Sequence, residues 1–106
     1  YGNISFMLTG DAPQEIENYL VETYGSQLDS DVLKLGHHGS KTSTSDAWLD
    51  TVSPRFAVVS AGIDNRYGHP HQDVMQRVFA RNIQTSHTGT DGTVIFQSDG
   101  ETIWRK

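Results

Sequence analysis

Five residues that could bind a metal ion or transfer a proton follow three apolar runs of this 106-residue sequence. They are Asp11, His37, His38, His69 and His71. Short apolar runs rich in β-branched residues predict strands, and groups just past the carboxyl ends of parallel strands gather at one edge of a sheet. Imidazole together with carboxylate suits zinc, manganese or iron rather than calcium. The pattern therefore predicts a metal site, in which a pair of cations lowers the pKa of a bound water and generates a nucleophile.

Each of these residues also has a purely structural interpretation. A pair such as His37-His38 more often comprises one packed and one solvated ring than two metal ligands. Asp11 stands where a carboxylate can cap a helix, and His71 directly precedes another predicted helix, for which a cap is the more common role. His87 has no partner nearby and is assigned to structure. The repetition of one strand, loop and helix pattern three times in series is what favours chemistry.

The order of apolar runs and helical patterns predicts an α/β fold in one domain that spans residues 1–106. Strands are predicted at residues 4–8, 32–35 and 55–60, and the helices that follow them at residues 13–24, 45–52 and 72–81. In the first helix the apolar residues form one face, and the glutamates, including Glu17, lie mostly on the opposite face. The tail, residues 83–105, alternates short strands with turn residues and predicts antiparallel, edge-forming strands.

Composition narrows the classes of function. The formal net charge of −5 argues against broad electrostatic attraction to nucleic acid, so a polyanionic substrate must be held locally by metal or by a few cations. The absence of cysteine excludes disulfides. No apolar run reaches membrane-spanning length, so we expect no membrane contact by this segment. The sequence enters a predicted strand at once without an initiator Met, which predicts an excised segment whose exposed sheet favours a homodimer or strand exchange.

Two polar loops supply candidates for holding an anionic substrate. Ser40 and Lys41 follow Gly39, where the backbone can approach a ligand closely, and their side chains can donate to phosphate oxygens. Hydroxyl-rich loops are also common without such a role. Arg66 lies in the second loop, near an aromatic residue and His69, a mixture that suggests substrate handling rather than packing.

Three stretches of the sequence together resemble a known family. They are residues 6–11 (FMLTGD), residues 31–43 (DVLKLGHHGSKTS) and residues 64–71 (DNRYGHPH). In order and spacing they are similar to the metallo-β-lactamase-like domain of the ComEC competence proteins, which take up DNA, and of their stand-alone relatives. The resemblance implies the C-terminal half of a metallo-β-lactamase-type αββα sandwich, with the N-terminal half of the same domain as its partner. It also implies a soluble domain of a bacterial membrane-associated competence protein, or a secreted or cytoplasmic stand-alone relative.

The resemblance further implies a dinuclear site with two divalent metal ions, zinc or manganese. Asp11 matches the bridging aspartate and His37 the late histidine ligand, with the adjacent His38 as the alternative. His69 matches a position near the substrate, either as a donor or as a proton shuttle. The HxHxDH motif that supplies most ligands in that fold is absent from this sequence. Because two protein ligands are too few for a tight site, we expect little hydrolase activity from the 106-residue segment alone.

The function that this resemblance implies is a metal-dependent hydrolase segment with phosphodiesterase or nuclease activity linked to DNA uptake. Its substrate would be DNA or another phosphodiester. Two alternatives remain open. The longer domain could be a catalytically inactive binding or gating module of a DNA-uptake channel. The segment could also be a self-standing α/β domain whose histidines are structural and whose stability is indifferent to zinc.

Overall fold

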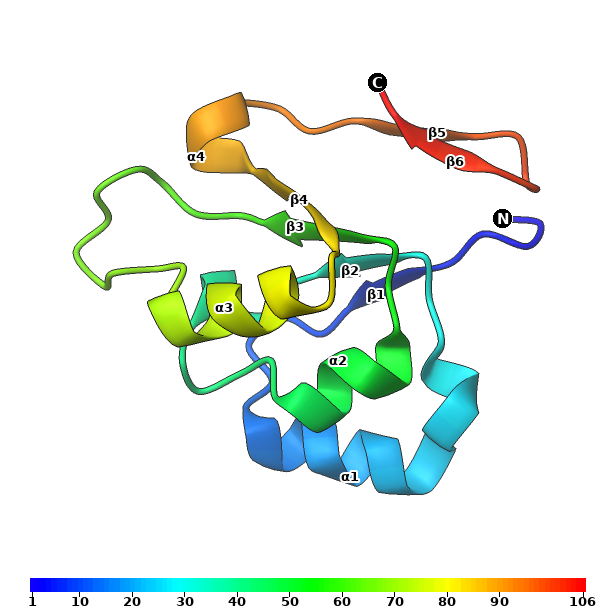
Figure 1. Ribbon diagram of the computed structural model, residues 1–106, viewed down its shortest axis with the longest axis horizontal. Coiled ribbons are helices and arrows are strands. Elements are labelled where there is room, and N and C mark those ends of the chain that lie inside the picture. The colour runs from blue at the N-terminus through cyan, green and yellow to red at the C-terminus, as the bar shows by residue number, and fades with distance from the viewer.

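The computed structural model describes residues 1–106 as a parallel sheet with its three longer helices on one face and a hairpin on the other (Figure 1). The sheet strands, in spatial order, are β1 (Phe6–Leu8), β2 (Val32–Lys34), β3 (Phe56–Val59) and β4 (Gln84–His87). The longer helices are α1 (Gln14–Tyr24), α2 (Asp46–Val52) and α3 (Gln72–Ala80), and the short ones are η1 (Gly25–Leu28), η2 (Gly36–Gly39) and α4 (Thr88–Asp91). The antiparallel hairpin consists of β5 (Phe96–Ser98) and β6 (Ile103–Arg105). The prediction of an α/β fold with a final antiparallel pair is confirmed.

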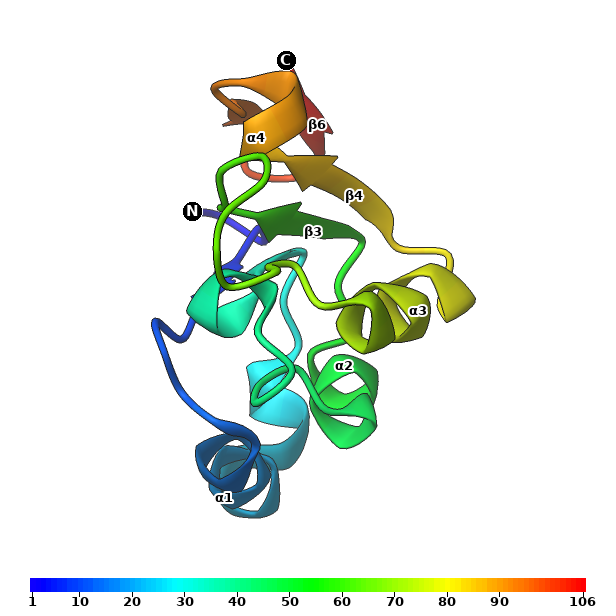
Figure 2. The same cartoon turned by 90° about the vertical axis from the view of Figure 1, so that its left-hand side faces the viewer.

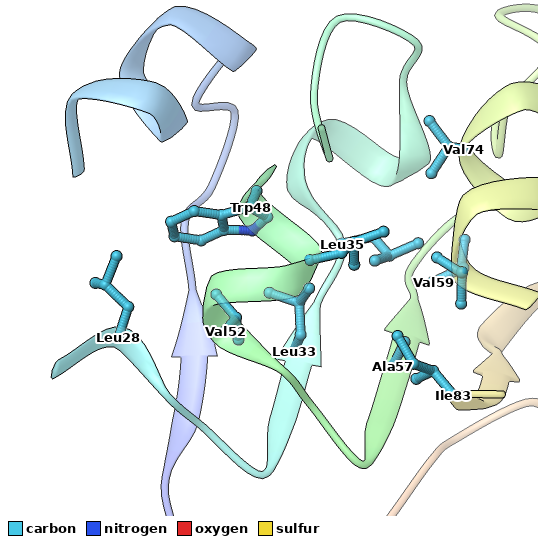
Figure 3. Close-up of a cluster of buried hydrophobic side chains, with 11 residues drawn as sticks. Leu28, Leu33, Leu35, Trp48, Val52, Ala57, Val59, Val74 and Ile83 are labelled. Carbon is cyan, nitrogen blue, oxygen red and sulfur yellow. The ribbon is translucent and has the colours of Figure 1, made fainter. Parts of the chain in front are cut away.

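The two faces of the sheet bury different side chains, because successive residues of a strand point to opposite sides. The helix side holds the larger core, which comprises Leu28, Leu33, Leu35, Trp48, Leu49, Val52, Ala57, Val59, Val74, Val78 and Ile83 (Figure 3). The hairpin side holds a smaller cluster of Ile4, Val32, Phe56 and Ile103. Both clusters include residues of β2 and β3, so the two central strands are held from both sides.

The prediction of an antiparallel strand at residues 83–86 is wrong. β4 pairs with β3 in parallel, with Gln84 opposite Phe56 and His87 opposite Val59. The connection explains the direction, because α3 lies between β3 and β4 and a helical crossover returns the chain to the same end of the sheet. The polar sequence of β4 suits an edge strand and concealed this role. The turn predicted directly after it is the short helix α4.

The apolar face of α1 is left largely uncovered. Ile16, Tyr19 and Tyr24 are 45%, 60% and 46% exposed, and Ile16 and Tyr24 line an apolar groove of 430 Å³ between α1 and β1. β1 pairs only with β2, so the backbone groups of its other edge have no strand partner. Phe6 and Leu8 of β1 are also more than half exposed. The β1 side of the molecule therefore presents an apolar surface that nothing within these residues covers.

Glu17 is fully buried, although the helical pattern placed it opposite the apolar face of α1. Its two carboxylate oxygens accept hydrogen bonds from the backbone N–H groups of Thr44 and Ser45, at 2.6 and 2.9 Å. Arg77 of α3 donates to the carbonyl oxygen of Thr44 at 2.9 Å. Burial raises the pKa of Glu17, and the two backbone hydrogen bonds and the charge of Arg77 oppose that rise. Glu17 thereby ties α1 to the loop between η2 and α2.

Candidate functional site

The loops that carry the predicted site residues emerge at one edge of the sheet, which Figure 2 views directly. Parallel strands end on the same side, so η2 after β2 and the loop after β3 are neighbours there. The backbone N–H of His37 donates to the carbonyl oxygen of Gly10 at 2.8 Å, which joins η2 to the loop that carries Asp11. The backbone N–H of His71 donates to the carbonyl oxygen of Gly39, also at 2.8 Å. The predicted gathering of these loops is therefore observed.

His37 and His38 have an unusual backbone conformation. Their φ angles are 48° and 56°, in the left-handed region that residues with a side chain rarely occupy. Gly39 follows with a φ of 82°, and a Cβ atom at this position would lie 2.6 Å from the Cβ atom of Pro70. Left-handed residues other than glycine are energetically costly and persist where the surrounding structure enforces them, often at functional sites.

The imidazole rings of His37, His38 and His69 form one cluster. The ring centroids are 5.5 Å apart for His37 and His69, 6.3 Å for His37 and His38, and 6.5 Å for His38 and His69. Nδ1 of His38 lies within hydrogen-bonding distance of the carbonyl oxygen of Ser60. When Nδ1 donates this bond, Nε2 keeps its lone pair, which is the arrangement in which histidine commonly binds metals.

The side chain of Asn65 closes the loop that carries His69. Its Nδ2 donates to the carbonyl oxygens of Gly62 and His69, and its Oδ1 accepts from the N–H groups of Tyr67 and His69 at 3.1 and 3.0 Å. Four hydrogen bonds from one carboxamide fix this turn in a single conformation. Asn65 is not among the site residues predicted from the sequence, although asparagine is a common turn residue whose side chain bonds to nearby backbone.

Arg66 reaches the histidine cluster only through Tyr67. The ring of Tyr67 stacks on His69, with centroids 5.7 Å apart and planes 26° from parallel. The guanidinium of Arg66 lies 4.9 Å from the centre of the Tyr67 ring and donates to the Tyr67 hydroxyl at 2.7 Å. Arg66 and Tyr67 are both exposed, so this cation faces solvent at the rim of the site.

The charge state of His69 depends on its neighbours. Burial lowers the pKa of His69, and the nearby imidazoles of His37, His38 and His71 lower it further. A lowered pKa favours the neutral ring, which can accept a proton or bind a cation. His69 is therefore more readily neutral than an isolated histidine.

The hydroxyl-rich loop is mostly bonded within itself. Ser40 is buried, and its hydroxyl lies 2.9 Å from the hydroxyl of Thr42. Ser43 is buried as well and donates to the carbonyl oxygen of Ala12 at 2.7 Å. Lys41 is exposed. Of the predicted anion-binding residues in this loop, Lys41 is the one whose side chain is free to meet a ligand at the surface.

The structural interpretations of Asp11, His71 and His87 have different outcomes. Asp11 does not cap α1, because the helix begins after Pro13 and has no side-chain cap. His71 does cap α3, as predicted, since its Nδ1 accepts from the N–H of Asp73 at 3.2 Å. His87 has its Nδ1 3.3 Å from the hydroxyl of Thr90, while its Nε2 is buried without a partner.

The donor chemistry fits a transition metal, but the number of donors is incomplete. Imidazole and carboxylate are the ligands that zinc and manganese take in proteins. No group of three or more His, Cys, Asp or Glu side chains lies close enough to hold a metal ion. Within these 106 residues, the donors predicted from the sequence therefore do not form a complete metal site.

The sequence is similar to segments of three much longer proteins. It is 40% identical to ComE operon protein 3 of Bacillus subtilis over 96 residues, which cover 91% of this chain and 12% of that protein. It is 44% identical to competence protein ComA of Neisseria gonorrhoeae over 95 residues, or 90% of this chain and 14% of that protein. Recombination protein 2 of Haemophilus influenzae is 41% identical over 93 residues, 88% of this chain and 11% of that protein.

These relatives point to a competence-related family. The chain spans between a tenth and a seventh of the length of these three proteins. No protein-family model matches the sequence. None of the helices is both long and apolar enough to span a membrane.

Proposed function

We propose that this chain is the C-terminal half of a metallo-β-lactamase-type domain whose whole is a metal-dependent phosphodiesterase or nuclease in DNA uptake. The observation that carries the proposal is the convergence of the Asp11 loop, η2 and the His69 loop at one sheet edge. The similarity to ComE operon protein 3 and to competence protein ComA supports the link to DNA uptake.

The incomplete donor set and the uncovered apolar surface support the proposal of a half domain. The apolar groove beside β1, and the exposed Phe6 and Leu8, suit burial against another part of the same domain. The missing ligands would come from that part, which would also cover the open sheet. A homodimer of the isolated segment would bury the same surface in its place.

In the assembled site each residue has a distinct role. Asp11 would help to hold the two divalent cations, in the bridging role that the resemblance implies, and His37 or His38 would bind one of them. The cations, when bound, lower the pKa of a water molecule and stabilise the charge that develops on a phosphoryl oxygen. His69 gives or takes a proton through its ring. Lys41 and Arg66 neutralise the phosphodiester, with Ser40 holding the Lys41 loop closed.

The test compares a longer protein that contains the whole proposed domain, called the longer protein below, with the isolated 106-residue segment. Each is assayed with zinc or manganese and with a chelator. We expect metal-dependent cleavage of DNA by the longer protein, and at least about 100-fold less by the segment, because the segment lacks most ligands. Thermal melting of the segment with and without zinc monitors its fold. DNA binding by the longer protein without any metal-dependent turnover contradicts the proposal and favours an inactive gating module.

A second experiment distinguishes the two adjacent histidines. We expect His37→Ala to lower the metal content of the longer protein more than His38→Ala, as measured by elemental analysis of the dialysed protein. The control is His71→Asn, which keeps an acceptor for the helix cap and removes an imidazole outside the proposed ligands. Equal metal content in the two alanine variants rejects this order. A larger loss in His38→Ala would make His38 the ligand, oriented by its bond to Ser60.

A further inference from the structure

A cleft of 460 Å³ opens beside the histidine cluster, between the loop after β3 and the beginning of α4. His38, Tyr67 and His69 line one side of it, and Gly62 and Thr88 line the rest together with their neighbours. Its volume lies in the range of pockets that hold small organic ligands. The cleft shares His38 and His69 with the proposed site, while Asp11, His37 and Lys41 do not line it.

The lining of the cleft has the wrong chemistry for a phosphate group. No lysine, arginine, aspartate or glutamate lines it, so it offers no fixed charge to pair with an anion. It presents instead three rings whose planes are nearly parallel, at 17° between His38 and His69 and 26° between Tyr67 and His69. Flat rings with hydroxyl and backbone groups around them suit a neutral aromatic ligand that carries polar edges.

The cleft is formed before any ligand enters. The hydroxyl of Thr88 accepts from the N–H of Ala61 at 3.2 Å, which ties α4 to the loop after β3. Gly89 packs so closely that a Cβ atom there would lie 2.7 Å from the carbonyl oxygen of Ala61. The Asn65 side chain holds the backbone of Tyr67 and His69 on the other wall. A preformed cleft loses little conformational entropy on binding.

We infer that this cleft binds a nucleobase of the substrate, next to the phosphodiester that the histidine cluster meets. The inference rests on the proposed phosphodiesterase function for the identity of the substrate. Stacking of a base on aromatic side chains is tolerant of sequence, so the cleft accepts bases without selecting one strongly. The uncharged cleft holds the base of the nucleoside, while the side chains of Lys41 and Arg66 neutralise the phosphate.

Gly62→Phe tests the inference because position 62 points into open space. No atom lies within 4 Å of a Cβ atom built there, and Gly62 is not among the residues with positive φ. A phenyl ring can therefore be added at this lining position of the cleft without backbone strain. Gly62→Ala is the matched control, since a methyl group leaves most of the volume free. Tyr67→Ala is a second variant that removes a stacking surface without adding bulk.

The first readout is binding of thymidine to the 106-residue chain, followed by backbone amide shifts in nuclear magnetic resonance spectra. We expect shifts concentrated at Gly62, Thr88 and Gly89 in the native chain and in Gly62→Ala. Binding should be about tenfold weaker or weaker still in Gly62→Phe and Tyr67→Ala, as for loss of one base-stacking contact. Absence of these shifts in the native chain, or equal binding by all variants, overturns the inference. The same spectra show whether each variant is folded.

The second readout separates this inference from the proposed activity. Thymidine 5′-(p-nitrophenyl) phosphate and methyl p-nitrophenyl phosphate share a leaving group and differ by the nucleoside. In the longer protein, Gly62→Phe should raise KM about tenfold for the first substrate only, again as for one lost stacking contact. If the native protein cleaves neither substrate, the proposed function is contradicted. Thymidine binding alone then tests whether the cleft binds a nucleobase. A tenfold rise for both substrates contradicts the nucleobase assignment.

Discussion

Asp11→Asn in the longer protein should reduce metal-dependent phosphodiester turnover by at least about 100-fold, because a neutral carboxamide cannot bridge two cations or offset their charge. The structure separates this chemical effect from a structural one. Asp11 is exposed, and α1 begins after Pro13 without a side-chain cap. The substitution should therefore leave the free energy of unfolding of the isolated segment within about 0.5 kcal/mol of the native value.

The matched control for this experiment is Asp64→Asn. Asp64 lies in the loop that carries His69, is exposed and has a φ of 56°, a conformation that asparagine also tolerates. The control removes one negative charge near the site while leaving the proposed ligands intact, so kcat should stay near the native value. Native turnover in Asp11→Asn, or an equal loss in both variants, shows that Asp11 is not the bridging ligand.

Glu17→Ala should lower the free energy of unfolding of the segment by about 2–4 kcal/mol, because it leaves the N–H groups of Thr44 and Ser45 without their acceptors. Chemical denaturation measures the loss. Glu22→Ala, at an exposed position of the same helix, should change the free energy by less than about 0.5 kcal/mol. A loss at position 17 no larger than that of the control contradicts the role assigned to Glu17.

The pH dependence of stability supplies an independent measure of the same carboxyl group. Burial raises the pKa of Glu17 in the folded protein. The contribution of this carboxyl group to the free energy of unfolding is therefore fully present below the pKa that Glu17 has in the unfolded chain. That contribution is lost as the pH rises through the raised pKa of the folded state. Glu17→Gln has no such titration, so the difference in unfolding free energy, native minus variant, should decrease with rising pH across this window. A difference that is independent of pH contradicts the assigned shift.

The local patterns in the sequence predicted most strands and helices correctly. They missed the features that depend on contacts between distant parts of the chain. The apolar runs at β2 and β3 follow from residue type and spacing alone. The direction of β4 depends on the crossover through α3, because its own residues are polar. The burial of Glu17 depends on a loop almost thirty residues away along the chain, which no helical period can reveal.

The candidate site was predicted in part for a similar reason. Asp11, His37 and His69 follow strands, so the rule for parallel sheets places their loops at one edge. The hydrogen bonds from the Asn65 side chain to its own loop, and the contact between Thr88 and Ala61, depend on side-chain directions that the sequence does not specify. The hydroxyl groups of residues 40–43 show the converse, because the buried Ser40 bonds to Thr42 and the buried Ser43 bonds to the backbone of Ala12 rather than facing a ligand.

The order of the sheet, β1-β2-β3-β4, has a consequence for how the chain assembles. Every pairing in the sheet joins strands that are consecutive in the sequence, so each pairing closes a loop of modest length and its entropic cost stays low. The parallel sheet can therefore grow one strand at a time in the order of synthesis. The loops bearing Asp11, His37 and His69 then acquire their relative positions from this segment's own pairing.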